Sequence, residues 1–148
     1  MNAYENDNDV MIGQLITKNW QLSGKKPDIY YDEGNDVVSH QFTENPVAIK
    51  VYIGDQSSTP QGISYDSERL FREVAIDVRG LNRADTINAK NEVRRILAVH
   101  RKYPGNNWDL IVLAGETRIT QTYNFYHQVV TYTLKKYFLP LPDLTWSA

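Results

Sequence analysis

The chain has 148 residues and a formal net charge of −2; 41% of its residues are hydrophobic and 23% are charged. This length is typical of one domain, and the average charge content excludes a disordered or fibrous class. The absence of cysteine excludes disulfides, thiolate catalysis and cysteine-ligated metals. No apolar run approaches the ~18 residues that span a bilayer, and the polar start lacks the apolar core of a signal peptide. We therefore expect no membrane segment and synthesis in a cytoplasm.

The charges are unevenly distributed. Residues 1–45 contain eight acidic and three basic side chains, and residues 46–148 contain ten acidic and thirteen basic ones. One end of the molecule is therefore expected to be acidic and another mildly basic. That arrangement suits head-to-tail contacts between copies, but ordinary proteins show the same asymmetry.

The first predicted element is an amphipathic helix from about Asn8 to Lys18. Its apolar positions recur at spacings of three and four, which is typical of one helix face: Ile12, Leu15, Ile16 and Trp20. Gly24 and Pro27 end any helical continuation. The stretch from Gly24 to Pro46 is irregular, with a possible short strand at residues 29–31.

Two alternating strands come next. Residues 47–53 and 69–79 each place apolar side chains on one face and polar ones on the other, which predicts an antiparallel pair with one wet face. Between them, Gly54 to Asp66 is rich in Ser, Gly, Gln and Pro, and we expect a mobile loop. Loops of this length tend to be functional or disordered.

A second helix is expected to start at Asn82, with Arg101 and Lys102 in its last turn, and to stop at the segment Pro104 to Asn107. Asp85 follows Asn82 in the manner of a capping box, and an apolar stripe runs over three turns: Ala89, Val93, Ile96, Leu97 and His100. A strand at 108–113 follows, with a possible continuation at 117–122, a turn at 123–125 and a long strand at 126–138 that is rich in β-branched and aromatic residues.

These elements predict an α+β fold in which two helices pack on one face of a mainly antiparallel sheet of four or five strands. Residues 1–148 are expected to form a single domain. Two closely spaced prolines, Pro140 and Pro142, favour an extended C-terminal arm over residues 139–148.

No residue pattern in the sequence is a strong signal for a catalytic or metal site, and we expect no catalytic, metal-binding or cofactor-binding residues. His40, His100 and His127 have no metal-ligand spacing. Glu73 and Asp77 share a strand face, as the carboxylates of a small metal-dependent nuclease would, although cross-strand ion pairs explain them more simply. A basic helix face is the basis of a nucleic-acid-binding alternative, although a solvated face is the commoner reason for it: Lys90, Arg94, Arg95, Arg101 and Lys102.

The aromatic C-terminal region indicates an assembly surface. Aromatic residues with polar tips are enriched at subunit interfaces, and one sheet face can bury only some of those in this ribbon; packing on the chain's own domain is the alternative. The residues that we expect at partner contacts are Gln56, Ser58, Thr59, Gln61 and Ile63 in the loop, Tyr126 and Tyr132 in the ribbon, and Leu144 and Trp146 in the arm.

The order of these elements resembles that of the tail-terminator and tail-completion proteins of long-tailed viruses. The matching segments are the helix Val10 to Trp20, the strand Pro46-Val-Ala-Ile-Lys-Val-Tyr-Ile53, the strand Arg72-Glu-Val-Ala-Ile-Asp-Val-Arg79 leading into the helix Ala84 to His100, and the ribbon Tyr126 to Phe138. The resemblance covers most of the chain and rests on pattern, without signature residues.

The resemblance implies a structural virion protein that is not an enzyme. Six copies would form a ring around a DNA channel, at the head-proximal end of the tail or in the neck. The ring would end tail-tube growth and join tail to head, after assembly in the host cytoplasm. Its partners would be its own copies, the tail tube protein and neck or connector proteins, with non-specific contact to genomic DNA in the lumen and no cofactor.

Overall fold

The computed structural model describes residues 8–31, 40–61 and 67–140. Two helices and six strands occur in this part of the chain: α1 (Asn8–Asn19), β1 (Asp28–Tyr31), β2 (Val47–Gln61), β3 (Ser67–Gly80), α2 (Arg83–Val99), β4 (Leu110–Glu116), β5 (Thr120–Thr122) and β6 (Phe125–Pro140). No helix in these ranges is long and apolar enough to cross a bilayer.

The six strands form one mixed sheet in the order β1-β2-β3-β6-β4, and β5 pairs with β6. Every pairing is antiparallel except that of β1 with β2. The α+β prediction is confirmed, but the expected four or five strands are one or two fewer than the six observed. Both segments that the sequence left open, residues 29–31 and 117–122, contribute a strand, β1 and β5 respectively.

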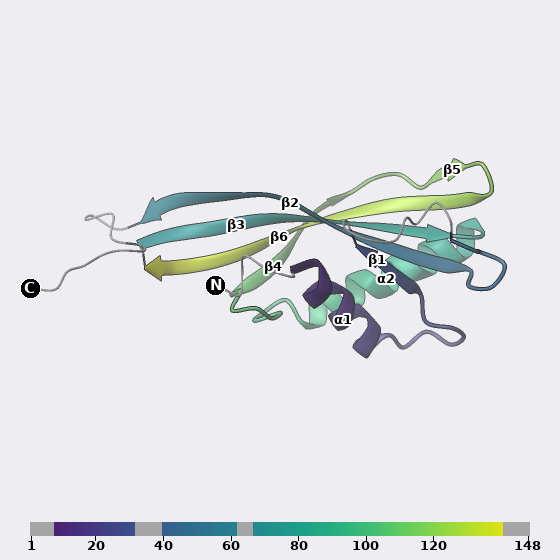
Figure 1. The fold of residues 1–148 in the computed structure, drawn as a ribbon, viewed down its shortest axis with the longest axis horizontal. Coiled ribbons are helices and arrows are strands. Elements are labelled where there is room, and N and C mark those ends of the chain that lie inside the picture. Colours follow the sequence, from purple (N-terminus) through teal and green to yellow (C-terminus); the bar gives the residue numbers. More distant parts are fainter. Residues whose placement is uncertain (1–7, 32–39, 62–66, 141–148) are drawn as a thin grey trace, which may run out of the picture.

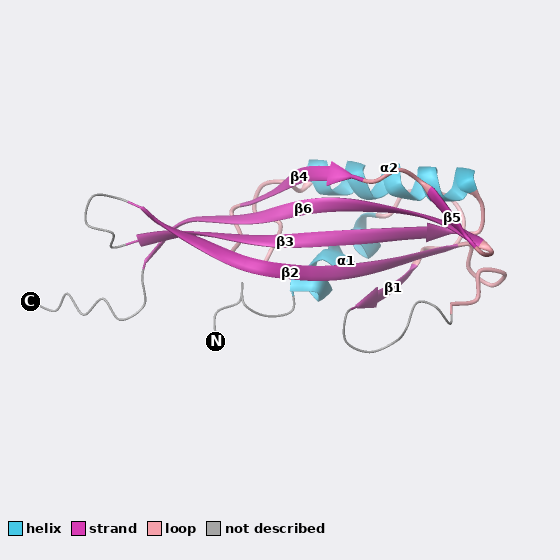
Figure 2. Cartoon of the chain, turned by 90° about the horizontal axis from the view of Figure 1, so that it is seen from above, coloured by secondary structure: helices cyan, strands magenta, loops and turns pink. Residues whose placement is uncertain are grey.

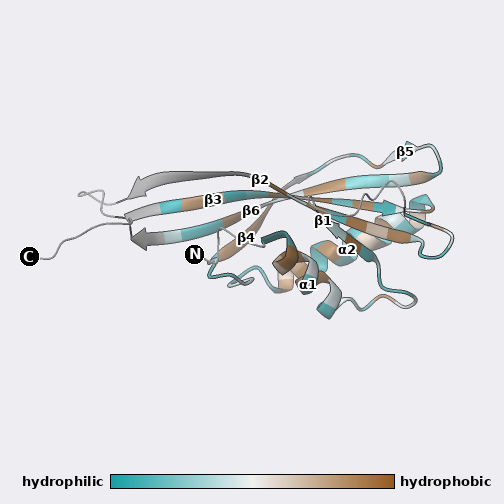
Figure 3. Ribbon diagram, in the orientation of Figure 1, coloured by the Kyte–Doolittle hydropathy of each residue, from teal (hydrophilic) through white to brown (hydrophobic). Residues whose placement is uncertain are grey.

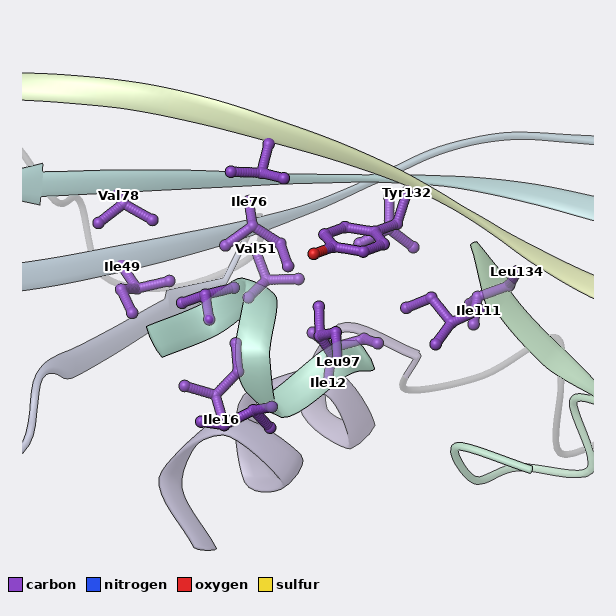
Figure 4. Packing of buried hydrophobic residues seen from close by; sticks show 14 of the residues in the cluster. Ile12, Ile16, Ile49, Val51, Ile76, Val78, Leu97, Ile111, Tyr132 and Leu134 are labelled. Carbon is purple, nitrogen blue, oxygen red and sulfur yellow. The ribbon is translucent and has the colours of Figure 1, made fainter. Parts of the chain in front are cut away.

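Both helices lie on the same face of the sheet (Figure 1), as predicted. The side chains between the helices and the sheet come from the apolar stripes of the helices and from the apolar, alternate residues of the strands. These apolar residues gather where the helices meet the sheet (Figure 3). Figure 4 shows this core, in which α1 contributes Ile12 and Ile16, α2 contributes Leu97, and the sheet contributes Ile49, Val51, Ile76, Val78, Ile111, Tyr132 and Leu134.

The ends of α2 follow the predicted signals. The Asn82 side chain accepts a hydrogen bond from the backbone N–H of Asp85 at 2.8 Å, which satisfies one of the free donors of the first turn. At the other end the N–H of His100 donates to the carbonyl of Ile96. His100 is the half-buried C-cap residue and does not belong to the buried stripe, which ends at Leu97.

Trp108 lies in the loop before β4, and the predicted strand begins two residues later than expected, at Leu110. The side chain is 1% exposed, and its indole N–H donates to the side-chain oxygen of Asn8 at 3.0 Å. A buried indole needs an acceptor. Asn8, at the start of α1, supplies it, so this hydrogen bond joins the start of α1 to the loop before β4.

The predicted loop from Gly54 to Asp66 is wrong in its larger part. β2 continues to Gln61 and β3 begins at Ser67, with a register irregularity between Ile53 and Gln56. Backbone hydrogen bonds hold this hairpin, so the polar composition of the segment does not prevent pairing. Gln56, Ser58, Thr59 and Gln61 are therefore strand residues; Ile63 lies outside the described residues.

β6 also runs two residues into the predicted C-terminal arm, because Leu139 and Pro140 pair with Glu68 and Ser67. Residues 141–148, with Leu144 and Trp146, lie outside the described part of the chain. The three longest strands thus continue together past the ends of the helices (Figures 1 and 2). We call this part, residues 56–61, 67–71 and 135–140, the strand extension.

Gly80 ends β3 at a close approach to α2. A Cβ atom there would lie 2.9 Å from the backbone nitrogen of Thr86 and even closer to its hydroxyl. We expect Gly80→Ala to lower the free energy of unfolding by about 1–3 kcal/mol through overpacking. Gly115→Ala is the matched control because no atom lies within 4 Å of its added Cβ. Urea unfolding checks both, and equal stability of the two variants would contradict the packing described here.

Candidate assembly surfaces

In the described part of the chain, both helices lie on one side of the sheet and leave its opposite face without a helix (Figure 1). We call this opposite face the outer face. It carries alternate residues of each strand, among them Lys50 and Tyr52 on β2 and Glu73 on β3. This is the wet face that the alternation predicts.

Cations and aromatic rings alternate on the outer face of the strand extension. The guanidinium of Arg69 lies 4.9 Å from the ring centroid of Tyr137 and 5.8 Å from that of Phe71. The ammonium of Lys135, which is paired with Phe71 across the ladder, lies 5.7 Å from the Phe71 ring. These distances are those of cation–π contacts. Together the four residues form a surface that offers positive charge and flat apolar area, and we call it the cation–aromatic patch.

The two carboxylates of the nuclease alternative do not share a site. Glu73 and Asp77 are four positions apart on one strand, a separation of ~13 Å, whereas ligands of one metal ion lie within ~2.6 Å of it. Glu73 is exposed. Asp77 has a 7% exposed side chain and is ion-paired with Arg79 at 2.9 Å. Among the described residues, no group of three or more His, Cys, Asp or Glu could hold a metal.

The surroundings of Asp77 are those of a structural ion pair. Its second oxygen lies 3.6 Å from Nδ1 of His127. The ring of Phe125 lies below the guanidinium of Arg79, at 5.2 Å, and Phe42 stacks on Phe125 at 5.4 Å between ring centroids. The segment before β2 therefore covers this end of the outer face, and the pair is shielded from water there.

His40 also has a structural role. Its Nδ1 lies 2.8 Å from the hydroxyl of Tyr30, and its Nε2 lies 2.9 Å from the carbonyl oxygen of Asn45. Both ring nitrogens are therefore occupied. The contacts fasten the segment before β2 onto β1.

The cations of α2 are largely paired, so the predicted basic helix face is not free. Lys90 and Arg94 lie 3.6 and 3.3 Å from one carboxylate oxygen of Glu116 on β4. Arg95 pairs with Glu92 at 2.7 Å, one turn away on the same helix. Arg101 and Lys102 follow the helix and are exposed. The nucleic-acid alternative therefore loses most of the surface on which it rested.

Glu92 links the two helices. Its buried carboxylate accepts hydrogen bonds from Arg95 and from the backbone N–H of Gln21, the latter at 2.6 Å. The hydrogen bond from Arg95 lowers the pKa of Glu92, and this effect exceeds the opposing effect of burial. The same guanidinium donates to the carbonyl of Asn19, the last residue of α1. The pair thus fixes the end of α1 against α2.

A groove runs between α2 and the edge strand β4. Its volume is about 220 Å³; Leu97 and Ala98 line it from α2, and Val112 and Leu113 line it from β4. Arg94 and Arg101 also border it. Leu113 is 41% exposed, which is unusual for a side chain on the helix-facing side of a sheet. The sequence patterns did not indicate this groove.

Tyr132, expected at a partner contact, is instead buried beside the groove. Only 3% of it is exposed, and burial raises its pKa to about 12. It shares the inner face of β6 with Val130 and Leu134 (Figure 4). Tyr126 is half-buried near the start of α2, where its carbonyl accepts a hydrogen bond from Thr86. The ribbon therefore buries one predicted contact residue and part of the other.

A comparison with models of protein families finds no match, and a comparison with curated proteins finds none either.

The Glu92 pair generates a pH-dependent prediction. At pH 7 we expect Glu92→Gln to lower the free energy of unfolding by about 1–3 kcal/mol, because a charged hydrogen-bond acceptor is lost. The folded-state pKa of Glu92 lies below the ordinary value of 4.5 for a glutamate side chain. The stabilisation is therefore complete above that pH and disappears as the pH falls through the folded-state pKa.

Urea unfolding of both proteins at pH 7, 5 and 3 checks this prediction. The difference should be similar at the two higher pH values and smaller at the lowest. The exposed Glu44 supplies the control, since Glu44→Gln should change stability little at any of them. A constant difference for Glu92→Gln across the series would contradict the charged pair.

Proposed function

We propose that the protein is a structural virion subunit that forms a ring, with six copies, at the head-proximal end of the tail or in the neck. The ring would end tail-tube growth and join tail to head. Its partners are then its own copies, the tail tube protein and neck or connector proteins. Such a protein works by fitting its partners and needs no catalytic group or cofactor.

The observation that carries this proposal is the strand extension. Three strands project past both helices as a ribbon (Figure 2), and β1 pairs with β2 only up to Val51. Within the described chain, no strand pairs with the outer edge of β2 from Gln56 to Gln61, in the strand extension. Unpaired strand edges are templates for pairing with another chain. An edge of this length is therefore well suited to contact between subunits.

Ring closure requires two different patches that fit each other on neighbouring copies. The protein offers chemically distinct surfaces for this: the cation–aromatic patch on the outer face and the apolar groove beside β4. Aromatic and arginine side chains are enriched at protein interfaces. Specificity would come from shape and charge complementarity.

Nucleic-acid contact has one specific observation in its favour. Arg69 and Lys135 present positive charge beside aromatic rings, a combination that also binds nucleic acids. In the ring this would be a non-specific contact with genomic DNA in the lumen. A separate nucleic-acid-binding module would show the same patch in a protein that does not assemble.

Native mass spectrometry and electron microscopy test the proposal, on the protein alone and mixed with tail tubes of the same virus. We expect a ring in solution or at tube ends. The double variant Arg69→Glu with Lys135→Glu should reduce ring formation by tenfold or more, roughly the effect of two lost interface contacts. Lys25→Glu with Arg118→Glu is the control, since both residues are exposed and lie outside the extension.

A protein that forms no ring under either condition would contradict the proposal. Salt-sensitive DNA binding by such a protein, abolished by the same double variant, would favour the nucleic-acid module instead.

A further inference from the structure

The groove beside β4 lies at an incomplete edge of the sheet. β4 is the last strand on this side, and α2 runs along the same edge (Figure 2). Near its start, β4 is covered by residues 101–103, because the N–H of Ile111 donates to the carbonyl of Arg101 at 2.8 Å. From Val112 to Glu116, no other described segment pairs with the outer edge.

The exposed edge has the geometry to accept one more strand. Backbone groups alternate in direction along a strand, so the N–H and C=O of Leu113 face outward, as the N–H of Ile111 does. A strand added there would lie under α2. Its helix-facing side chains would then fill the groove and cover Leu97, Ala98 and Leu113. Peptides that add to a sheet edge in this way gain affinity from the backbone and specificity from alternate side chains.

We infer that the occupant is residues 143–147 of a second copy of this chain. This deepens the proposed ring function by naming a contact between its subunits, and it rests on that proposal. The segment Asp-Leu-Thr-Trp-Ser contains no proline and follows Pro142 directly. In an extended conformation Leu144 and Trp146 point to the same side, so both enter the groove together while Thr145 faces away from it.

Size and charge both fit this occupant. A dry apolar cavity of ~150 Å³ holds a benzene ring, so a groove of about 220 Å³ has room for an indole. The groove is bordered by Arg101, which is exposed, and by Arg94, which is ion-paired with Glu116. Residues 139–148 carry one acidic side chain, Asp143, and no basic one, so the charge that the segment brings complements that of Arg101.

The chain's own segment cannot reach the same place. Pro140 lies at the tip of the strand extension, and Tyr132, which is paired with Leu113, is ~26 Å back along β6. From Pro140 to Trp146 the chain spans at most ~20 Å, even without the reversal that a return would need. A neighbouring copy has no such limit, so the contact joins two molecules.

Cysteine cross-linking between mixed copies tests the inference, and the absence of native cysteine removes any background. One batch carries Val112→Cys, next to Leu113 on β4 but with its side chain on the opposite face of the sheet by strand alternation, and the other carries Thr145→Cys. After mixing and mild oxidation we expect a disulfide-linked dimer to form at least roughly tenfold faster than with Ser23→Cys in place of Val112→Cys, because docking raises the effective concentration.

Side-chain variants in the same assay show which contacts hold the segment. Leu144→Ser with Trp146→Ser, or Leu113→Glu alone, should reduce cross-linking by about 30-fold, as expected for loss of a buried aromatic or apolar anchor. Leu81→Glu is the matched control: Leu81 is 42% exposed, almost the same as Leu113, but lies between β3 and α2. It should leave the yield unchanged.

The outcomes separate this inference from the ring proposal. A ring that forms without cross-linking, or that survives Leu144→Ser with Trp146→Ser unchanged, overturns the docking and leaves the ring standing. Cross-linked dimers without any ring support the docking and count against the ring. A linkage formed only within single molecules of a Val112→Cys, Thr145→Cys double variant overturns the second copy as occupant, as does cross-linking of Val112→Cys to tail tube protein alone.

Discussion

The pairing of β6 with its neighbours is the constraint on which the rest of the structure depends. β6 bonds β3 along nearly its whole length and also bonds β4 and β5, so it is the strand that joins the two halves of the sheet. Its inner side chains Val130, Tyr132 and Leu134 belong to the core. Because the same ladder continues to Pro140, the strand extension is an unbroken continuation of the packed sheet and is held by it.

The sequence predicts most of this fold because burial of one face leaves a period in the chain. The helix stripes and the alternating halves of β2 and β3 follow directly from that period. The long hairpin does not follow from it, since residues 56–61 are held by backbone pairing with β3, which leaves no side-chain pattern in the sequence. Trp108 differs for another reason: Asn8, a hundred residues away, supplies the acceptor that lets it be buried in a loop.

The surfaces are less predictable than the fold because they depend on register. Tyr132 lies two residues from both Val130 and Leu134, so all three side chains are on the same face of β6. The alternation of apolar residues along this strand therefore indicates that Tyr132 is buried, as the structure shows. The cation–aromatic patch needs Phe71 opposite Lys135, a pairing between distant strands that no local pattern gives. The groove exists because β4 ends the sheet under α2. The sequence likewise gives no sign that Lys90 and Arg94 on α2 are ion-paired, because their partner Glu116 lies on β4, more than twenty residues along the chain.

The position of β6 also determines when the protein can fold. The middle of the sheet is closed by the strand that is made last, after α2 and β4, so its contacts join residues far apart in the chain. Such non-local pairings form slowly. Until β6 is synthesised, the edges of β3 and β4 that pair with it have no partner. A nascent chain that ends before β6 therefore has an incomplete sheet. A copy can therefore complete this sheet only after β6 has been made.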